Sequence, residues 1–179
     1  MRIDAQGLLV GGEYAPSPNC DDRPADTTIE LLVIHNISLP PEEFGSDGVQ
    51  RLFTNTLDVT VHPYYQTIAG LKVSSHFFVR RDGQTIQFVP CIKRAWHAGE
   101  SCWQGQFRCN DFSIGIELEG SDSVPFTDAQ YPALERLTLA LRAVYPIRGI
   151  AGHSDISPQR KTDPGPCFDW TRYLTSCAK

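Results

Sequence analysis

The chain has 179 residues, of which 41% are hydrophobic and 21% are charged. This length and composition suit one globular domain with a full hydrophobic core, and they exclude a disordered or low-complexity chain. The formal net charge of −5 argues against a nucleic-acid-binding protein, because such proteins usually carry a basic face.

The first residues carry an acid at Asp4 and lack the apolar stretch of a secretory signal. No segment approaches the roughly 20 apolar residues of a membrane-spanning helix. We therefore expect a soluble, cytoplasmic protein. Pro16, Pro18 and Pro24 interrupt any regular element near the start. This pattern predicts an irregular N-terminal arm over residues 1–27 and a single domain over residues 28–179.

The first half of the domain begins with a buried strand. Residues 28–34 are β-branched and apolar with little alternation, which predicts a central strand covered on both faces. Residues 36–48 form a loop, and Asp47 is placed to cap a short helix that ends at Phe53. We expect residues 54–73 to be loop with a short helix.

A hairpin and a second buried strand follow. Asp82-Gly83 separates two β-rich segments, residues 75–80 and 85–89, and is a strong hairpin signal. Residues 113–119 alternate strictly, which predicts a strand with two distinct faces. One face holds Ile114, Ile116 and Leu118, and the other holds Gly115, Glu117 and Glu119.

The last third alternates helix and strand. Residues 127–130 resemble a capping box, and the apolar residues from Tyr131 to Val144 follow helical spacing, with Pro132 in the first turns. Residues 148–151 predict a short strand, and residues 168–176 predict a closing helix with Asp169 near its start. This order of elements predicts an α/β fold with one mixed sheet flanked by helices.

The six cysteines are expected to be reduced thiols, because the chain shows no export signal. None of their spacings forms a C-x-x-C pair, so a cysteine zinc cluster is not expected. They are Cys20, Cys91, Cys102, Cys109, Cys167 and Cys177.

Two histidines stand where predicted strands end. His35 follows the first strand, and His153 follows the strand over residues 148–151. Active sites of open α/β sheets gather at such strand ends, although a lone histidine there is more often structural. Asp163 lies ten residues after His153 in a loop fixed by a Pro-Gly-Pro sequence. Two imidazoles and one carboxylate predict a zinc site that leaves one position open for water.

Glu117 and Lys161 supply the remaining groups that such a site needs. Glu117 lies in mid-strand beside the small Gly115 and is placed to take a proton from water. Lys161 precedes the expected ligand Asp163 by two residues and would stabilise a developing oxyanion. Taken singly, Lys161 is a surface lysine, and a solvent-facing role suits Glu119.

Four segments together resemble the zinc-dependent N-acetylmuramoyl-L-alanine amidases, and more closely the branch that acts on 1,6-anhydro muropeptides in peptidoglycan recycling. The resemblance covers nearly the whole chain beyond about residue 10. It implies the peptidoglycan-recognition fold, the metal ligands His35, His153 and Asp163, and the catalytic pair Glu117 and Lys161. The segments are residues 33–41, 93–99, 109–120 and 152–166.

The same resemblance implies the reaction and the substrate contacts. Zn²⁺ and Glu117 would hydrolyse the amide between 1,6-anhydro-N-acetylmuramic acid and L-alanine of the stem peptide. Arg108 and Lys72 fall at basic substrate positions, although an arginine is expected at position 72. Asn36 and Trp96 lie in motifs beside the metal site, where Trp96 either stacks on the sugar or packs in the core. The other histidines, His62, His76 and His97, are expected to have core or surface roles.

Two other functions stay open at this point. A broader amidase would act on intact peptidoglycan, and a recognition module would bind muropeptide without cleaving it. The complete set of expected ligands and catalytic groups argues against the module. The expected partner is a small muropeptide, with no nucleic acid, no membrane and no obligate protein partner.

Overall fold

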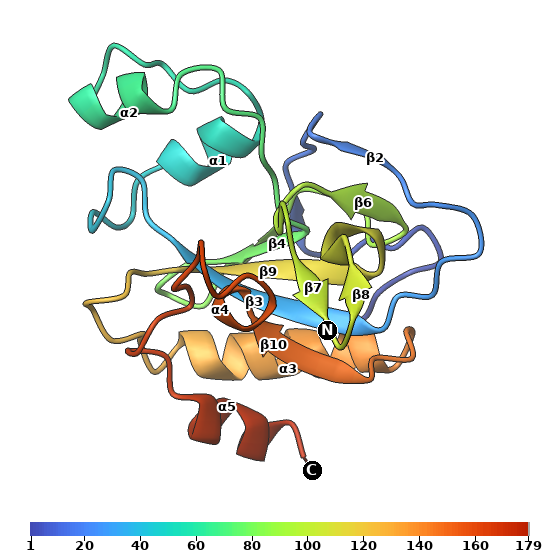
Figure 1. Cartoon of the computed structure of the whole chain (residues 1–179). Helices are drawn as coiled ribbons and strands as arrows, with labels where there is room; N and C mark the ends of the chain where they lie inside the picture. The colour runs from blue at the N-terminus through green and yellow to red at the C-terminus, as the bar shows by residue number, and fades with distance from the viewer. Residues whose placement is uncertain (179) are drawn as a thin grey trace.

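A six-stranded mixed sheet forms the centre of the computed structural model, which describes residues 1–178 (Figure 1). Its order is β1-β5-β4-β9-β3-β10, and every neighbouring pair is parallel except the β4–β5 hairpin. The predicted mixed α/β fold with flanking helices is confirmed. The strands are β1 Glu13–Tyr14, β3 Leu31–Ile37, β4 Phe77–Val79, β5 Thr85–Gln87, β9 Ser113–Glu119 and β10 Gly149–Gly152.

One face of the sheet is covered by the two longest helices, α3 (Gln130–Arg142) and α5 (Trp170–Ser176) (Figure 1). Side chains alternate along a strand, so Ile34 of β3 and Ile116 of β9 both point to this face. They join the largest apolar cluster together with residues of both helices. This face is the packed core, and its apolar cluster includes neither the expected metal ligands nor Glu117.

The opposite face carries short elements: α1 (Gly48–Phe53), α2 (Pro63–Thr67), a 3₁₀ turn η1 and α4. Two separate apolar clusters cover it. One packs Phe53 and Phe78 beneath α1, and the other packs Val33 against residues of η1 and α4. The odd-numbered residues of β3 and β9 lie on this face, where β3 carries His35 and β9 carries Glu117 and Glu119. The turn and the helix span Cys109–Asp111 and His153–Ile156.

The N-terminal arm is less irregular than predicted. Its β1 extends the main sheet, and β2 (Cys20–Asp22) pairs with β6 (Lys93–Ala95). Arg23 then donates hydrogen bonds to the carbonyl oxygens of Cys91, Asn110, Asp111 and Ser113. Pairing at a sheet edge needs only backbone groups, so the proline-rich composition did not reveal it. The arm is attached to the body along its length.

Several local predictions differ from the structure. Asp47 precedes α1, but its carboxylate accepts from Arg51 Nε at 2.7 Å and does not cap the helix. Only half of the expected capping box forms, because Thr127 donates its hydroxyl to Arg81 O while Gln130 Oε1 accepts from Thr127 N. A hairpin of β7 (Cys102–Trp103) and β8 (Gln106–Phe107) was not predicted.

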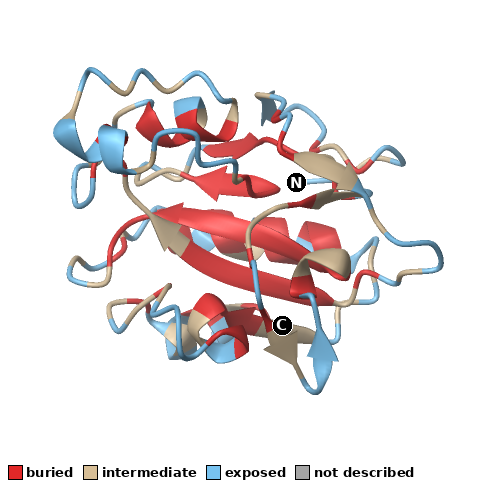
Figure 2. Cartoon of the chain, turned by 45° about the horizontal axis from the view of Figure 1, so that its top comes forward, coloured by how far each residue is buried: buried red, intermediate tan, exposed pale blue. Residues whose placement is uncertain are grey.

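Burial follows this layout: the central strands are buried, whereas α2 and β8 are largely exposed (Figure 2). None of the described helices has the length and apolar character that crossing a bilayer requires. All six cysteines have free thiols. Lys179, the last residue of the expected domain, lies outside the described residues.

Candidate metal centre and active site

Parallel strand register brings the three expected ligands together. His35 lies on β3 opposite Glu117 of β9, and the β10 residue Gly152 pairs with Ile34, so His153 emerges level with His35. The two Nδ1 atoms lie 3.0 Å apart. Asp163 Oδ2 lies 3.0 Å from Nδ1 of His35 and 3.1 Å from Nδ1 of His153.

These separations and donors fit a metal ion. Tetrahedral zinc with bonds of about 2.0–2.1 Å holds its ligand atoms about 3.3 Å apart, close to the spacing of this triangle. Both histidines are buried and Asp163 is half-buried, so the three donors point inward from fixed backbone. The cluster of His35, His153 and Asp163 is compatible with a metal site that keeps one position for solvent or substrate.

The electrostatics favour the protonation states that bind a metal. Burial lowers the pKa of His35 to about 4, so its imidazole is neutral at pH 7. Burial by itself would raise the pKa of Asp163, but hydrogen bonds with His153 and His35 outweigh it and hold that pKa below its usual range. A neutral imidazole and a charged carboxylate are the ligand forms that coordinate zinc.

Glu117 is the carboxylate beside this cluster. Burial raises its pKa well above the ordinary value; the charge of Asp163 adds to the rise and that of Lys161 opposes it. Its Oε2 is buried and meets no hydrogen-bond donor within the described part of the chain. An acid with a raised pKa and an uncommitted oxygen suits proton transfer near neutral pH.

A cavity of about 260 Å³ opens at the cluster and is bordered by Glu117, Lys161, Asn36 and Trp96. Lys161 also borders an adjoining cavity of similar size, together with Lys72 and Trp96. Trp96 is half-buried and lines both cavities. Asn36 donates its amide to Asp122 and to the Pro164 carbonyl, which ties β3 to the loop that carries Asp163.

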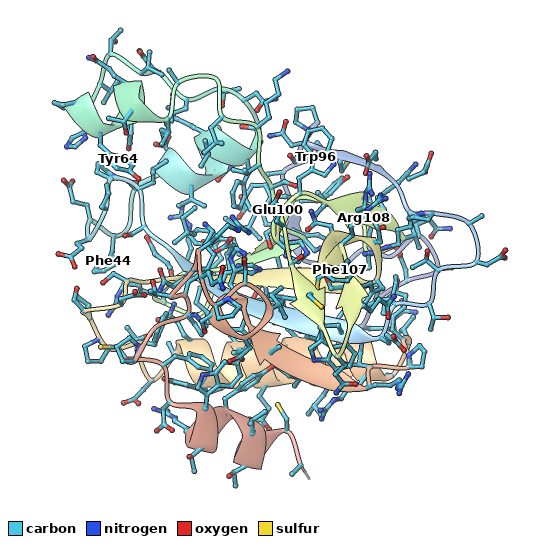
Figure 3. All side chains as sticks on the ribbon, viewed as in Figure 1. Phe44, Tyr64, Trp96, Glu100, Phe107 and Arg108 are labelled. Carbon is cyan, nitrogen blue, oxygen red and sulfur yellow. The ribbon has the colours of Figure 1, made fainter. Side chains whose placement is uncertain are left out.

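Arg108 is the expected site residue that the structure does not bring to the metal cluster. It follows β8 with a side chain that is 70% exposed, and its Nε pairs with Asp111 at 3.2 Å. It borders a separate cavity of about 630 Å³ with Phe107. Figure 3 shows Phe107 and Arg108 on the β7–β8 side, with Tyr64 on α2 at the other side.

The solvent-facing role expected for Glu119 is wrong. Its side chain is buried at the end of β9 and accepts from the backbone N–H groups of Gly45 and Arg81. Glu119 therefore holds two loops to the sheet. All seven residues of β9 are buried. The alternating sequence therefore distinguished the two faces of the strand but could not show whether either face is exposed to solvent.

His97 is the residue that sequence reasoning missed. Its Nδ1 lies 2.9 Å from Nε2 of His35, so it belongs to the site and not to the core or surface. Its presence in the same motif as Trp96 was the available signal. The other two histidines have structural roles as expected: His62 caps α2, and His76 accepts from the N–H of Gly115.

Sequence comparison defines the class of protein. The N-acetylmuramoyl-L-alanine amidase profile matches residues 25–166, and the chain belongs to this family. It is 56% identical to the 1,6-anhydro-N-acetylmuramyl-L-alanine amidase AmpD of Escherichia coli, over 97% of this chain and 96% of the relative.

Solved structures agree with this assignment. A selenomethionine AmpD derivative superposes with a TM-score of 0.95 at 54% identity, covering 98% of this chain and 99% of that one. The amidase AmiD of Escherichia coli, solved with anhydro-N-acetylmuramic acid-L-Ala-D-γ-Glu-L-Lys, gives a TM-score of 0.60 at 33% identity. That match covers 86% of this chain and 60% of AmiD.

Proposed function

We propose that this protein is a zinc-dependent amidase that cleaves the bond between 1,6-anhydro-N-acetylmuramic acid and L-alanine of the stem peptide in peptidoglycan recycling. The observation that carries the proposal is the buried His35–His153–Asp163 triangle with Glu117 facing the same cavity. The name of the 56% identical relative, AmpD, and the substrate bound to AmiD support the choice of sugar.

Zinc is the metal that the donor set favours, since two neutral imidazoles and one carboxylate with an open position are typical of catalytic zinc. Bound there, zinc would polarise the scissile carbonyl and lower the pKa of a coordinated water from about 16 to about 7. His35, His153 and Asp163 would hold it.

Two side chains carry out the proton and charge chemistry. Glu117 takes the proton of the attacking water, which its raised pKa allows, and later delivers a proton to the leaving amine of L-alanine. Lys161 borders the cavity and carries a fixed positive charge toward the carbonyl oxygen as that atom becomes negative. The C–N bond then breaks, which leaves the lactyl carboxylic acid of the sugar and the free amine of the L-alanine peptide.

The substrate side chains are assigned by charge and position. Trp96 offers a flat apolar surface for the sugar, and Asn36 lies at the same wall of the cavity. Lys72, next to Trp96, and Arg108, farther along, would meet the carboxylates of the stem peptide. Arg108 borders a separate cavity and not the one at His35, His153 and Asp163, so we assign it to a part of the peptide away from the scissile bond.

One comparison of substrates tests the function. Purified zinc-loaded protein is incubated with anhydro-muropeptide, with the same peptide on ordinary N-acetylmuramic acid, and with intact sacculi. We expect much faster release of peptide from the anhydro sugar, because the bridged ring has a shape that an adapted pocket can distinguish by clash and unmatched hydroxyls. Equal kcat/KM on both sugars, or rapid digestion of sacculi, would favour a broader amidase. Binding of muropeptide without turnover would favour a recognition module.

We further propose that residues 28–179 form the catalytic domain, that the protein works in the cytoplasm, and that its small muropeptide substrate is its only required partner. The small anhydro-muropeptide bound to AmiD supports the expectation of a small-molecule substrate. Fractionation of cells that express the tagged protein tests the location, and activity of the purified chain alone tests the need for a partner.

A further inference from the structure

The adjacent residues His97 and Ala98 contact the outer nitrogens of both histidines in the metal cluster. His97 Nδ1 lies 2.9 Å from Nε2 of His35, and the carbonyl oxygen of Ala98 lies 3.0 Å from Nε2 of His153. We infer that this dipeptide positions the two histidine ligands of the metal centre. It holds each imidazole ring so that its unprotonated Nδ1 points toward the metal position. The inference rests on the proposed metal site.

The contact of His153 fixes its tautomer directly. A backbone carbonyl can only accept, so Nε2 of His153 must carry the hydrogen that it donates to Ala98. In the neutral ring the other nitrogen then has a lone pair. That nitrogen, Nδ1, is the atom that faces Asp163 in the cluster.

The contact of His35 is fixed through one more side chain. Ser113 donates its hydroxyl to the carbonyl of Cys109 at 2.5 Å, so its oxygen is left to accept from Nε2 of His97 at 3.3 Å. With its hydrogen on Nε2, neutral His97 has a lone pair on Nδ1 and accepts from Nε2 of His35. His35 therefore carries its hydrogen on Nε2, and its Nδ1 has the free lone pair that metal binding requires.

The dipeptide is itself held rigidly. Asn110 Oδ1 accepts from the N–H groups of both His97 and Ala98, at 3.2 and 2.8 Å. Gly115 of β9 supplies the space, because a Cβ there would lie 2.5 Å from Cγ of the His97 ring. The ring therefore lies against the backbone of the strand, where hydrogen bonds at both nitrogens prevent it from moving aside. Outer contacts of this kind commonly change metal affinity by about 10- to 100-fold.

Two substitutions at position 97 separate the hydrogen bond from simple packing. His97→Leu removes the acceptor, whereas His97→Asn keeps an oxygen near the place of Nδ1. We expect His97→Leu to weaken zinc binding about 10- to 100-fold in chelator competition and to alter the visible spectrum of the cobalt-substituted protein. His97→Asn should stay within a few-fold of the wild type in both measurements. Wild-type zinc affinity in His97→Leu, or equal losses in both variants, would overturn the inference.

A third variant tests the role of the strand. Gly115→Ala keeps every polar group but displaces the His97 ring, so it should weaken zinc binding as His97→Leu does. Unchanged zinc affinity and an unchanged cobalt spectrum in a folded Gly115→Ala protein would contradict the proposed packing.

The wild-type protein gives a measurement that does not depend on any variant folding. With five histidines in the chain, ¹⁵N NMR of the zinc-loaded protein can assign each tautomer. We expect hydrogen on Nε2 and metal on Nδ1 for both ligands, and hydrogen on Nε2 for His97; coordination through Nε2 of either ligand would refute the inference. Peptide release is measured separately, so an inactive protein with this tautomer pattern would reject the proposed function and leave the positioning role intact.

Discussion

Two glutamates two residues apart on β9 have different environments. Both are buried on the same face, yet Glu119 accepts two backbone N–H groups while Glu117 has an oxygen without a donor among the described residues. A carboxylate that accepts hydrogen bonds from the backbone has a structural role. A carboxylate oxygen without a donor, beside the candidate metal ligands, is free to exchange a proton. Both residues are glutamates on the same face of one strand, so only their hydrogen-bond partners distinguish their roles.

This difference predicts opposite effects of two matched substitutions. Glu117→Gln should lower kcat by about 10²- to 10⁴-fold and leave zinc content unchanged, because it removes the proton acceptor but no metal ligand. Glu119→Gln should keep kcat within a few-fold and lower stability by about 1–3 kcal/mol, because one of its two N–H partners loses its acceptor. Steady-state kinetics, metal analysis and urea unfolding distinguish the two; comparable losses of kcat would contradict the assignment.

The raised pKa of Glu117 also predicts how stability depends on pH in the metal-free protein. In the folded state Glu117 keeps its proton to a higher pH than in the unfolded chain, where the pKa of a glutamate is about 4.3. Between those two pKa values the fold binds more protons, so this group makes stability fall as pH rises. Glu117→Gln should therefore gain stability over the wild type as pH increases from 4 to 7. Parallel stability curves across this range would show that the pKa is not raised.

At the scale of elements, the N-terminal arm supports the site through Arg23. Its half-buried guanidinium donates to carbonyls of Cys91, Asn110, Asp111 and Ser113, and desolvation lowers its pKa to about 10. These carbonyls lie in the segments around η1 and at the start of β9. The arm thus fixes the turn from which Asn110 reaches the segment behind the metal cluster.

We expect Arg23→Met to lower the free energy of unfolding by about 3 kcal/mol or more, because it leaves several partly buried carbonyls without the donor that they share. Arg148→Met is the matched control: its exposed guanidinium has one ion pair, with Glu30, and the loss should be below about 1 kcal/mol. Urea unfolding of both metal-free variants measures the difference. Similar losses would mean that the arm lies on the body without supporting it.

At the scale of the whole molecule, the site joins segments that are far apart in the chain. His35 and His153 are 118 residues apart and lie side by side because β3 and β10 are parallel neighbours. Asp163 lies on the loop that follows α4. Asn36 of β3 holds this loop by donating a hydrogen bond to the Pro164 carbonyl. A metal ion bound there would link the edge strand, the centre of the sheet and the C-terminal loop.

Metal binding should therefore stabilise the entire fold. Zinc at 100 times its dissociation constant adds about 2.7 kcal/mol if the unfolded chain does not bind it. We expect chelator to lower the Tm of the wild type and zinc to restore it, whereas the Tm of His35→Ala should respond to neither. An equal response of His35→Ala would place the metal elsewhere.

The sequence by itself determined the fold class, the central strands and the long helix, because burial leaves a periodic pattern in the order of apolar residues. It also predicted His35, His153 and Asp163 as a cluster, since strand ends and a Pro-Gly-Pro loop are local features. Short strands such as β1, β2, β7 and β8 escaped prediction because edge pairing depends on backbone groups that every residue has.

Only the tertiary structure decided the role of residues whose meaning lies in their neighbours. Two loops donate backbone N–H groups to Glu119, whereas Glu117 Oε2 has no donor among the described residues. His97 joins the site because Gly115 on β9 leaves room for its ring. Arg108 stands apart from the cluster because the β7–β8 hairpin carries it to another cavity. Hydrogen-bond partners and close contacts across distant segments depend on three-dimensional distance, which the order of residues does not contain.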